Sequence, residues 1–88
     1  MDEKKFEKQL KQEGFRVTYT WEDRPGTYHS NHIHPLTTAH IILDGTMTLV
    51  VKGTSHELNP GDRFDVPEST VHSARVGPKG CRYLIGEK

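Results

Sequence analysis

The spacing of apolar residues changes once along the chain, and the change separates a helical segment from a β-rich one. In residues 2–13, Phe6 and Leu10 are four positions apart among charged residues, and Gly14 follows where a helix C-cap would lie. In residues 15–21, apolar side chains occupy every second position, as in a half-buried strand. The pattern predicts a short amphipathic helix followed by a β domain.

The rest of the chain consists of short β-rich runs separated by turn residues. Strands are predicted to end near Pro35 and to span residues 38–43, 46–51, 56–58, 64–66, 71–76 and 82–85. Asp44-Gly45 is expected to close a hairpin, because Asp-Gly between β-rich runs is a strong hairpin signal. Lys52-Gly53 is expected to form a second turn, and residues 77–80 a loop. Many short strands with Gly and Pro turns indicate a β-sandwich or barrel.

Composition narrows the classes of function. The 88 residues suffice for one domain, whose small core would gain stability from an oligomer or a bound metal ion. Lys plus Arg and Asp plus Glu both number 12, so the chain carries no basic footprint for nucleic acid or membrane. The lone cysteine, Cys81, excludes an internal disulfide, and the charged start lacks a signal-peptide pattern. We therefore expect a cytoplasmic protein without nucleic-acid or membrane partners.

Three histidines lie among turn glycines in the β-rich segment. His32 and His34 form a His-x-His pair, and side chains two apart on a strand point to the same face. His72 follows on a later strand. Two imidazoles on one face, with a third from another strand, commonly hold a divalent first-row metal ion. By the same parity His29 is expected to face away from His32, and His56 to lie at a hairpin end.

The order and spacing of these residues resemble the two motifs of the cupin family. The first motif runs Gly-x5-His-x-His-x3-4-Glu-x6-Gly, and its glycines and histidines correspond to Gly26, His32, His34 and Gly45. The second runs Gly-x5-Pro-x-Gly-x2-His-x3-Asn, and its matching positions are Gly61, Pro67 and His72. Ser69 stands in place of the inner glycine and Val76 in place of the asparagine. The resemblance implies an all-β fold, with a helix in residues 1–14 and a double-stranded β-helix, or jelly-roll barrel, over residues 15–88.

The resemblance also implies a metal ion held in the mouth of this barrel. The matching ligands are His32, His34 and His72. The glutamate of the first motif is missing: one spacing places its slot at Thr38, and the longer spacing places it at Ala39. Neither side chain is a carboxylate, so the fourth ligand cannot be assigned from the motif.

His40 lies two positions beyond Thr38, about 6.6 Å further along a strand, and is expected to face the same way. It would bind the metal directly only if the ion sat deeper in the barrel. Otherwise it is a proton-transfer group beside the metal, or a buried histidine hydrogen-bonded to a neighbour. His40 is therefore the candidate catalytic residue and a candidate fourth metal ligand.

Two classes of function are compatible with this site. Three neutral imidazoles leave a divalent ion (Fe, Zn, Mn or Ni) with a charge of about +2, which favours a small anionic ligand. The first hypothesis is a metal-dependent enzyme of dioxygenase or isomerase type that acts on such a molecule. The second is a module with the same barrel that binds or senses the molecule or the metal without turnover. A homodimer is expected, in contact through the helix or the strand at residues 15–21.

Overall fold

The computed structural model describes residues 2–88, which form one helix and six strands. The elements are α1 Glu3–Gln12, β1 Val17–Asp23, β2 Tyr28–His32, β3 Thr38–Val51, β4 Thr54–Leu58, β5 Arg63–Val66 and β6 His72–Glu87. The expected all-β fold with a short N-terminal helix is confirmed; Met1, which the helical segment was predicted to include, lies outside the described residues. None of the described residues forms a helix long and apolar enough to cross a membrane.

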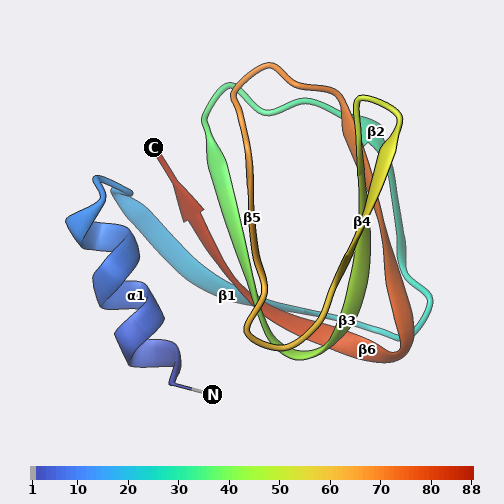
Figure 1. Ribbon diagram of the computed structural model, residues 1–88, viewed down its shortest axis with the longest axis horizontal. Helices are drawn as coiled ribbons and strands as arrows, with labels where there is room; N and C mark the ends of the chain where they lie inside the picture. Colours follow the sequence, from blue (N-terminus) through green and yellow to red (C-terminus); the bar gives the residue numbers. More distant parts are fainter. Residues whose placement is uncertain (1) are drawn as a thin grey trace.

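Two long strands, β3 and β6, pair with each other along most of their length. Figure 1 shows that both bend at the bottom of the view, so that their halves lie on opposite sides of a flattened barrel. One side has the strand order β1-β6-β3-β5 and the other has β2-β6-β3-β4, with every pair antiparallel. This is the arrangement of a double-stranded β-helix, and its two walls share the same two strands.

The predicted hairpin at Asp44-Gly45 and the predicted loop at residues 77–80 are wrong. Both segments lie inside continuous strands, and the register of β3 against β6 shifts on either side of Asp44 and Gly45. Gly45 has a φ of +79°, and a Cβ there would overlap the carbonyl oxygen of Gly80. The Asp44-Gly45 dipeptide therefore forms a bulge that bends the strand. A bulge of this kind and a hairpin turn both need a residue with positive φ, so the sequence alone does not distinguish them.

Other predicted turns are confirmed. Lys52 and Gly53 both have positive φ and connect β3 to β4, whose first pair is Val51 with Thr54. This is the backbone of a two-residue hairpin turn. The tight turn before β5 is closed by a hydrogen bond from the Asp62 backbone N–H to the Asn59 carbonyl oxygen, at 2.8 Å.

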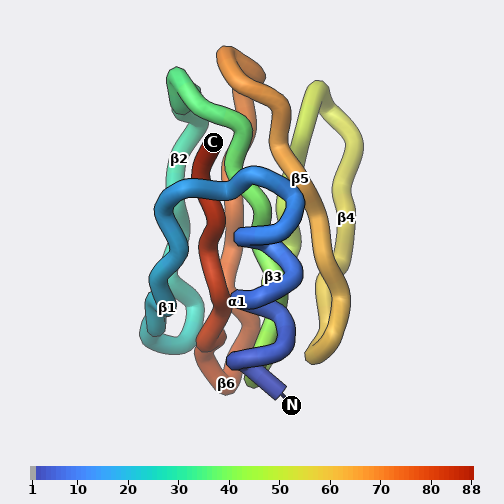
Figure 2. Tube along the Cα trace, turned by 90° about the vertical axis from the view of Figure 1, so that its left-hand side faces the viewer, coloured from blue at the N-terminus to red at the C-terminus, as the bar shows by residue number. Residues whose placement is uncertain are grey.

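Apolar side chains form two clusters on either side of the sheet that contains β1. The inner cluster fills the barrel and comprises Ile42, Met47, Leu49, Val51, Leu58, Val66, Ala74, Val76, Cys81, Tyr83 and Ile85. The outer cluster comprises Leu10, Phe15, Ala39, Ile41, Leu43 and Leu84. Figure 2 shows α1 lying over the outer side of β6 and β3. Burial of Leu10 and Phe15 stabilises this contact by roughly 1.5–3 kcal/mol for each side chain.

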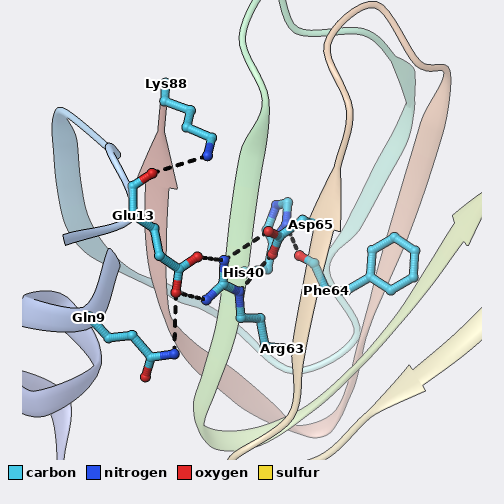
Figure 3. Close-up of polar contacts among 7 residues, drawn as sticks. All are labelled: Gln9, Glu13, His40, Arg63, Phe64, Asp65 and Lys88. Atoms are coloured by element: carbon cyan, nitrogen blue, oxygen red, sulfur yellow. Dashed lines mark hydrogen bonds and ion pairs between the residues drawn. The ribbon is translucent and has the colours of Figure 1, made fainter. Parts of the chain in front are cut away.

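An arginine joins the end of α1 to β5. The Arg63 guanidinium donates to both carboxylate oxygens of Glu13, at 2.9 and 2.7 Å, and to both of Asp65, each at 2.8 Å (Figure 3). The hydrogen bonds from Arg63 lower the pKa of Glu13 below its ordinary value. These contacts hold the helix against the outer face of the barrel.

β1 differs from the sequence-based prediction in its bounds and in its burial. Phe15 turns inward before the strand begins, and its backbone N–H donates to the Leu10 carbonyl oxygen at 3.0 Å. The apolar side chains of the strand are not half-buried, since Val17, Tyr19 and Trp21 are 48%, 40% and 53% exposed. β1 is an edge strand, so this face borders the open side of the barrel. The homodimer contact predicted for this strand stays a prediction.

The bend at Gly45 can be tested with a matched pair of alanine substitutions. Gly45→Ala is expected to lower the free energy of unfolding by roughly 2–5 kcal/mol, because left-handed strain adds to overlap with Gly80. Gly53→Ala has the same φ of +79° with no atom within 4 Å of the new Cβ, and should cost roughly 1–2 kcal/mol. Urea unfolding measures both losses; equal losses would show that the contact with Gly80 contributes nothing.

Candidate metal centre

The structure brings together the three histidines that the sequence singles out. One ring nitrogen from each of His32, His34 and His72 lies within 4.8 Å of the other two. Ring centroids are 4.2 Å apart for His32 and His72, 4.9 Å for His32 and His34, and 5.2 Å for His34 and His72. His32 and His72 are cross-strand partners on β2 and β6. Side chains remote in sequence thus converge because these strands pair.

His34 joins the cluster from outside the strand, so the alternation of side chains along a strand does not explain its position. β2 ends at His32, so His34 lies two residues beyond the strand rather than on it. Its position is held by the turn before β6, where the Ser69 backbone N–H donates to the His34 carbonyl oxygen at 2.8 Å. Ser69 has a φ of +58°, which explains why the second cupin motif has glycine at this position.

Hydrogen bonds fix the tautomers of two of the rings. His72 Nδ1–H donates to the Thr70 carbonyl oxygen at 2.9 Å, and His32 Nδ1–H donates to the Ser30 carbonyl oxygen at 2.6 Å. A carbonyl can only accept, so the proton of each neutral ring is on Nδ1 and the lone pair is on Nε2. Carbonyl partners of this kind orient the histidine ligands of metal sites and raise their basicity as ligands.

The surroundings of His34 and His72 favour neutral imidazoles. Burial lowers the pKa of His72, and the neighbouring rings of His32 and His34 act in the same direction. Burial also lowers the pKa of His34, and the neighbouring His32 ring lowers it further. A neutral imidazole is the form that binds a metal ion. The three imidazole nitrogens that converge here fit a divalent transition metal ion by the chemistry of the donor set.

The slot of the missing glutamate is occupied by Thr38. Thr38 is 3% exposed, lines the cavity beside the histidines, and donates its hydroxyl hydrogen to the Leu36 carbonyl oxygen at 3.2 Å. Ala39 is fully buried in the outer cluster beneath α1. The geometry therefore decides between the two positions that motif spacing leaves open, and the residue in the slot is not a carboxylate.

His40 lies in the same cavity but outside the cluster of three ligand atoms. It is 8% exposed, and its Nδ1–H donates to the Phe64 carbonyl oxygen at 3.3 Å (Figure 3). Burial lowers the pKa of His40 to about 4, so the ring is neutral near pH 7 with its lone pair on Nε2. Its predicted roles, in metal binding and in proton transfer, stay predictions.

The histidines line a cavity of about 270 Å³ between the two walls of the barrel. Its lining is drawn from both walls and comprises Tyr19, Trp21, His29, His32, His34, Thr38, His40, Met47, Leu49, His72, Ala74, Tyr83, Ile85 and Glu87. Apolar and aromatic side chains make up much of this surface, as in pockets for small molecules.

Sequence reasoning missed a polar network at one edge of the cavity. The buried carboxylate of Asp23 accepts hydrogen bonds from the Trp21 indole at 2.9 Å, from the Tyr83 hydroxyl at 2.8 Å and from His29 Nε2 at 2.8 Å. Burial raises the pKa of Asp23, but the hydrogen bonds from these three residues outweigh it, so the pKa lies below its ordinary value. Asp23 is thus an ionised group that orients His29.

The expectation that His29 faces away from His32 is wrong. Both residues line the cavity, because the register of β2 against β6 shifts between them. An extra residue in a strand reverses the parity of everything beyond it. The sequence around His29 contains no Gly or Pro that would have signalled this bulge.

The sequence profile of the Cupin domain family matches residues 19–85, which is most of the chain. The chain belongs to the cupin family. The match covers β2 to β5 in full and most of β1 and β6, together with the three histidines of the cluster.

This cupin is similar to quercetin 2,3-dioxygenase from Bacillus subtilis (strain 168), with 43% identity over 49 residues, or 56% of this chain and 13% of that protein. It is similar in structure to the DMSP lyase DddQ from Ruegeria pomeroyi, with a TM-score of 0.75 and 25% identity over 81% of this chain and 36% of the other. An RmlC-like cupin from Shewanella frigidimarina gives a TM-score of 0.74 and 22% identity, over 81% and 63% of the two chains. The chain thus spans a small part of the curated dioxygenase that it matches.

The low pKa of His40 predicts a specific pH dependence in metal-free protein. Below pH 6.5 the unfolded chain takes up a proton at His40 that the folded protein does not bind until about pH 4. The free energy of unfolding should therefore fall as the pH drops from 6.5 to 4, by up to about 3 kcal/mol from this residue. Urea unfolding of wild type and His40→Gln measures this, and the variant should lose less stability over the range. A pH dependence in His40→Gln equal to that of wild type would contradict the prediction.

Proposed function

We propose that this cupin is a metal-dependent enzyme, of dioxygenase or isomerase type, that acts on a small anionic molecule. In this proposal His32, His34 and His72 bind one Fe, Zn, Mn or Ni ion through Nε2. The observation that carries it is the convergence of these three nitrogens, within 4.8 Å of one another, in the wall of an open cavity. A bound ion would act as a Lewis acid toward an oxygen of the substrate.

The cavity is suited to a small ligand. Its volume of about 270 Å³ lies just below the range of roughly 300–1,000 Å³ for drug-sized molecules. Tyr19 and Trp21 line the cavity from the edge strand, and aromatic rings of this kind can pack against an unsaturated substrate. An ion with three neutral ligands keeps a charge of about +2, so an anionic group on the substrate is favoured. The similarity to a quercetin 2,3-dioxygenase supports the dioxygenase type.

Two side chains are placed to move protons in this cavity. The ionised Asp23 carboxylate accepts from His29 Nε2–H, so the Nδ1 of His29 is free to exchange a proton with a ligand. His40 presents its own Nε2, but a pKa of about 4 makes it a weak base near pH 7. General-base efficiency is greatest for a pKa near the working pH, which disfavours His40, whereas the hydrogen bond to Asp23 orients His29 for this role.

The weak basicity of His40 also supports a second candidate function. In this alternative the same three histidines and the same cavity bind or sense a metal-chelated small molecule without turnover. The two functions share the binding of metal and ligand and differ in whether the bound ligand is converted to a product.

Metal binding can be tested before any substrate is known. Elemental analysis of purified wild-type protein is expected to find close to one equivalent of a transition metal. His32→Ala removes one of three ligands and should weaken binding on the order of 100-fold or more, beyond the 10–100-fold typical of residues that only orient ligands. His56→Ala should bind as wild type does, since His56 lies outside the cluster. Wild-type protein that neither contains metal nor binds added Fe, Mn, Ni or Zn would overturn both candidate functions.

Turnover separates the two functions. Iron-loaded protein is assayed for O₂ uptake, and zinc-loaded protein for isomerisation, with a panel of diketones, keto acids and thiols. On the enzyme proposal at least one compound is consumed, and His29→Gln lowers kcat by roughly 10²–10⁴-fold with metal content unchanged. His56→Gln is the control and should retain the wild-type kcat. Compounds that bind tightly to the loaded protein but are not consumed would favour the binding module.

A further inference from the structure

The last strand carries an acidic residue into the cavity that no motif predicts. Along β6, Tyr83, Ile85 and Glu87 line the cavity at every second position. The residues between them face the helix: a Cβ on Gly86 would lie 3.1 Å from side-chain atoms of both Leu10 and Phe15. The alternation of the strand therefore directs the Glu87 side chain to the histidines.

Glu87 lies directly beside the slot of the missing glutamate. Thr38 on β3 and Glu87 on β6 are cross-strand partners. Directly opposed residues point to the same face of a sheet, with Cβ atoms about 4.5–5.5 Å apart. Both line the cavity that holds the three histidines. A carboxylate is thus present one strand away from the place where the family motif has one.

The Glu87 carboxylate has no partner of its own within residues 2–88. None of the ion pairs or side-chain hydrogen bonds in this part of the chain involves it, although the residue is half-buried. Its charge acts on the cavity: burial raises the pKa of Tyr19, and Glu87 raises it further. The adjacent Lys88 is engaged elsewhere, donating from Nζ to the Glu13 carbonyl oxygen at 3.2 Å (Figure 3).

We propose that Glu87 supplies the carboxylate ligand of the metal centre, from β6 instead of from the Thr38 position on β3. The proposal rests on metal binding by His32, His34 and His72. The carboxylate lies outside the 4.8 Å cluster of nitrogens, so it reaches the ion by rotation about its own side-chain torsions. Ligation lowers the charge of the centre from about +2 to about +1 and gives the half-buried carboxylate a counter-charge.

The experiment uses Co²⁺ and Zn²⁺ as probes on the full chain. Glu87→Gln keeps the size of the side chain and is expected to weaken Co²⁺ binding at least 10–100-fold and to alter the visible spectrum of the bound ion. Glu57→Gln, exposed on β4, is the matched control and should bind Co²⁺ as wild type does. Thr38→Glu added to Glu87→Gln should restore affinity, because it returns a carboxylate to the motif position.

A measurement without substitution accompanies these variants. In wild-type protein labelled with ¹³C at glutamate, the Cδ resonance of Glu87 should shift on addition of one equivalent of Zn²⁺. Glu87→Gln with wild-type affinity and an unchanged spectrum, or a Cδ resonance that does not move, would overturn the assignment of Glu87. Wild-type protein that binds neither ion would instead overturn the proposed metal centre.

Discussion

The long antiparallel pairing of β3 with β6 is the constraint on which the site depends. Because both strands bend at the same place, each contributes one half to each wall of the barrel. The bend requires close approach of two backbones, at Gly45 and Gly80, where a side chain on Gly45 would not fit. His40 and Thr38 are therefore held on one wall, while His72 is held on the other. A single pair of strands sets the width of the cavity.

Hydrogen bonds with backbone groups position the three histidines at the mouth of the barrel. The Ser69 backbone N–H holds the His34 segment, and carbonyl oxygens of Ser30 and Thr70 set the tautomers of His32 and His72. These contacts come from the turn before β6 and from the irregular part of β2, where backbone groups are not used in regular strand pairing. Main-chain groups thus hold the three histidines in place. The neighbouring residues contribute through their backbone, and only the ligand positions themselves need a particular side chain.

Much of the fold and the three-histidine cluster could be predicted from sequence because both depend on local patterns. Strand alternation and turn residues indicate a β barrel, and motif spacing brings His32, His34 and His72 to one site. The wrong hairpin at Asp44-Gly45 and the wrong orientation of His29 share one physical cause. Bulges at Asp44-Gly45 and after His29 change strand continuity and parity, and both depend on the partner strand β6 rather than on local sequence. Tertiary pairing thus decides which face a side chain occupies once a strand is irregular.

The same dependence explains why the acidic groups of the cavity were not found from motifs. In the sequence Asp23 and Glu87 are both simply acidic residues. In the structure of residues 2–88 the Asp23 carboxylate is hydrogen-bonded and the Glu87 carboxylate is not. Asp23 accepts from three donors, so its charge is already compensated and fixes the orientation of His29. Glu87 is uncompensated within residues 2–88 and faces the histidines across a strand from Thr38. Since a cation is stabilised most by an anion that has no other partner, the charge at Glu87, rather than that at Asp23, is the one available to a metal ion.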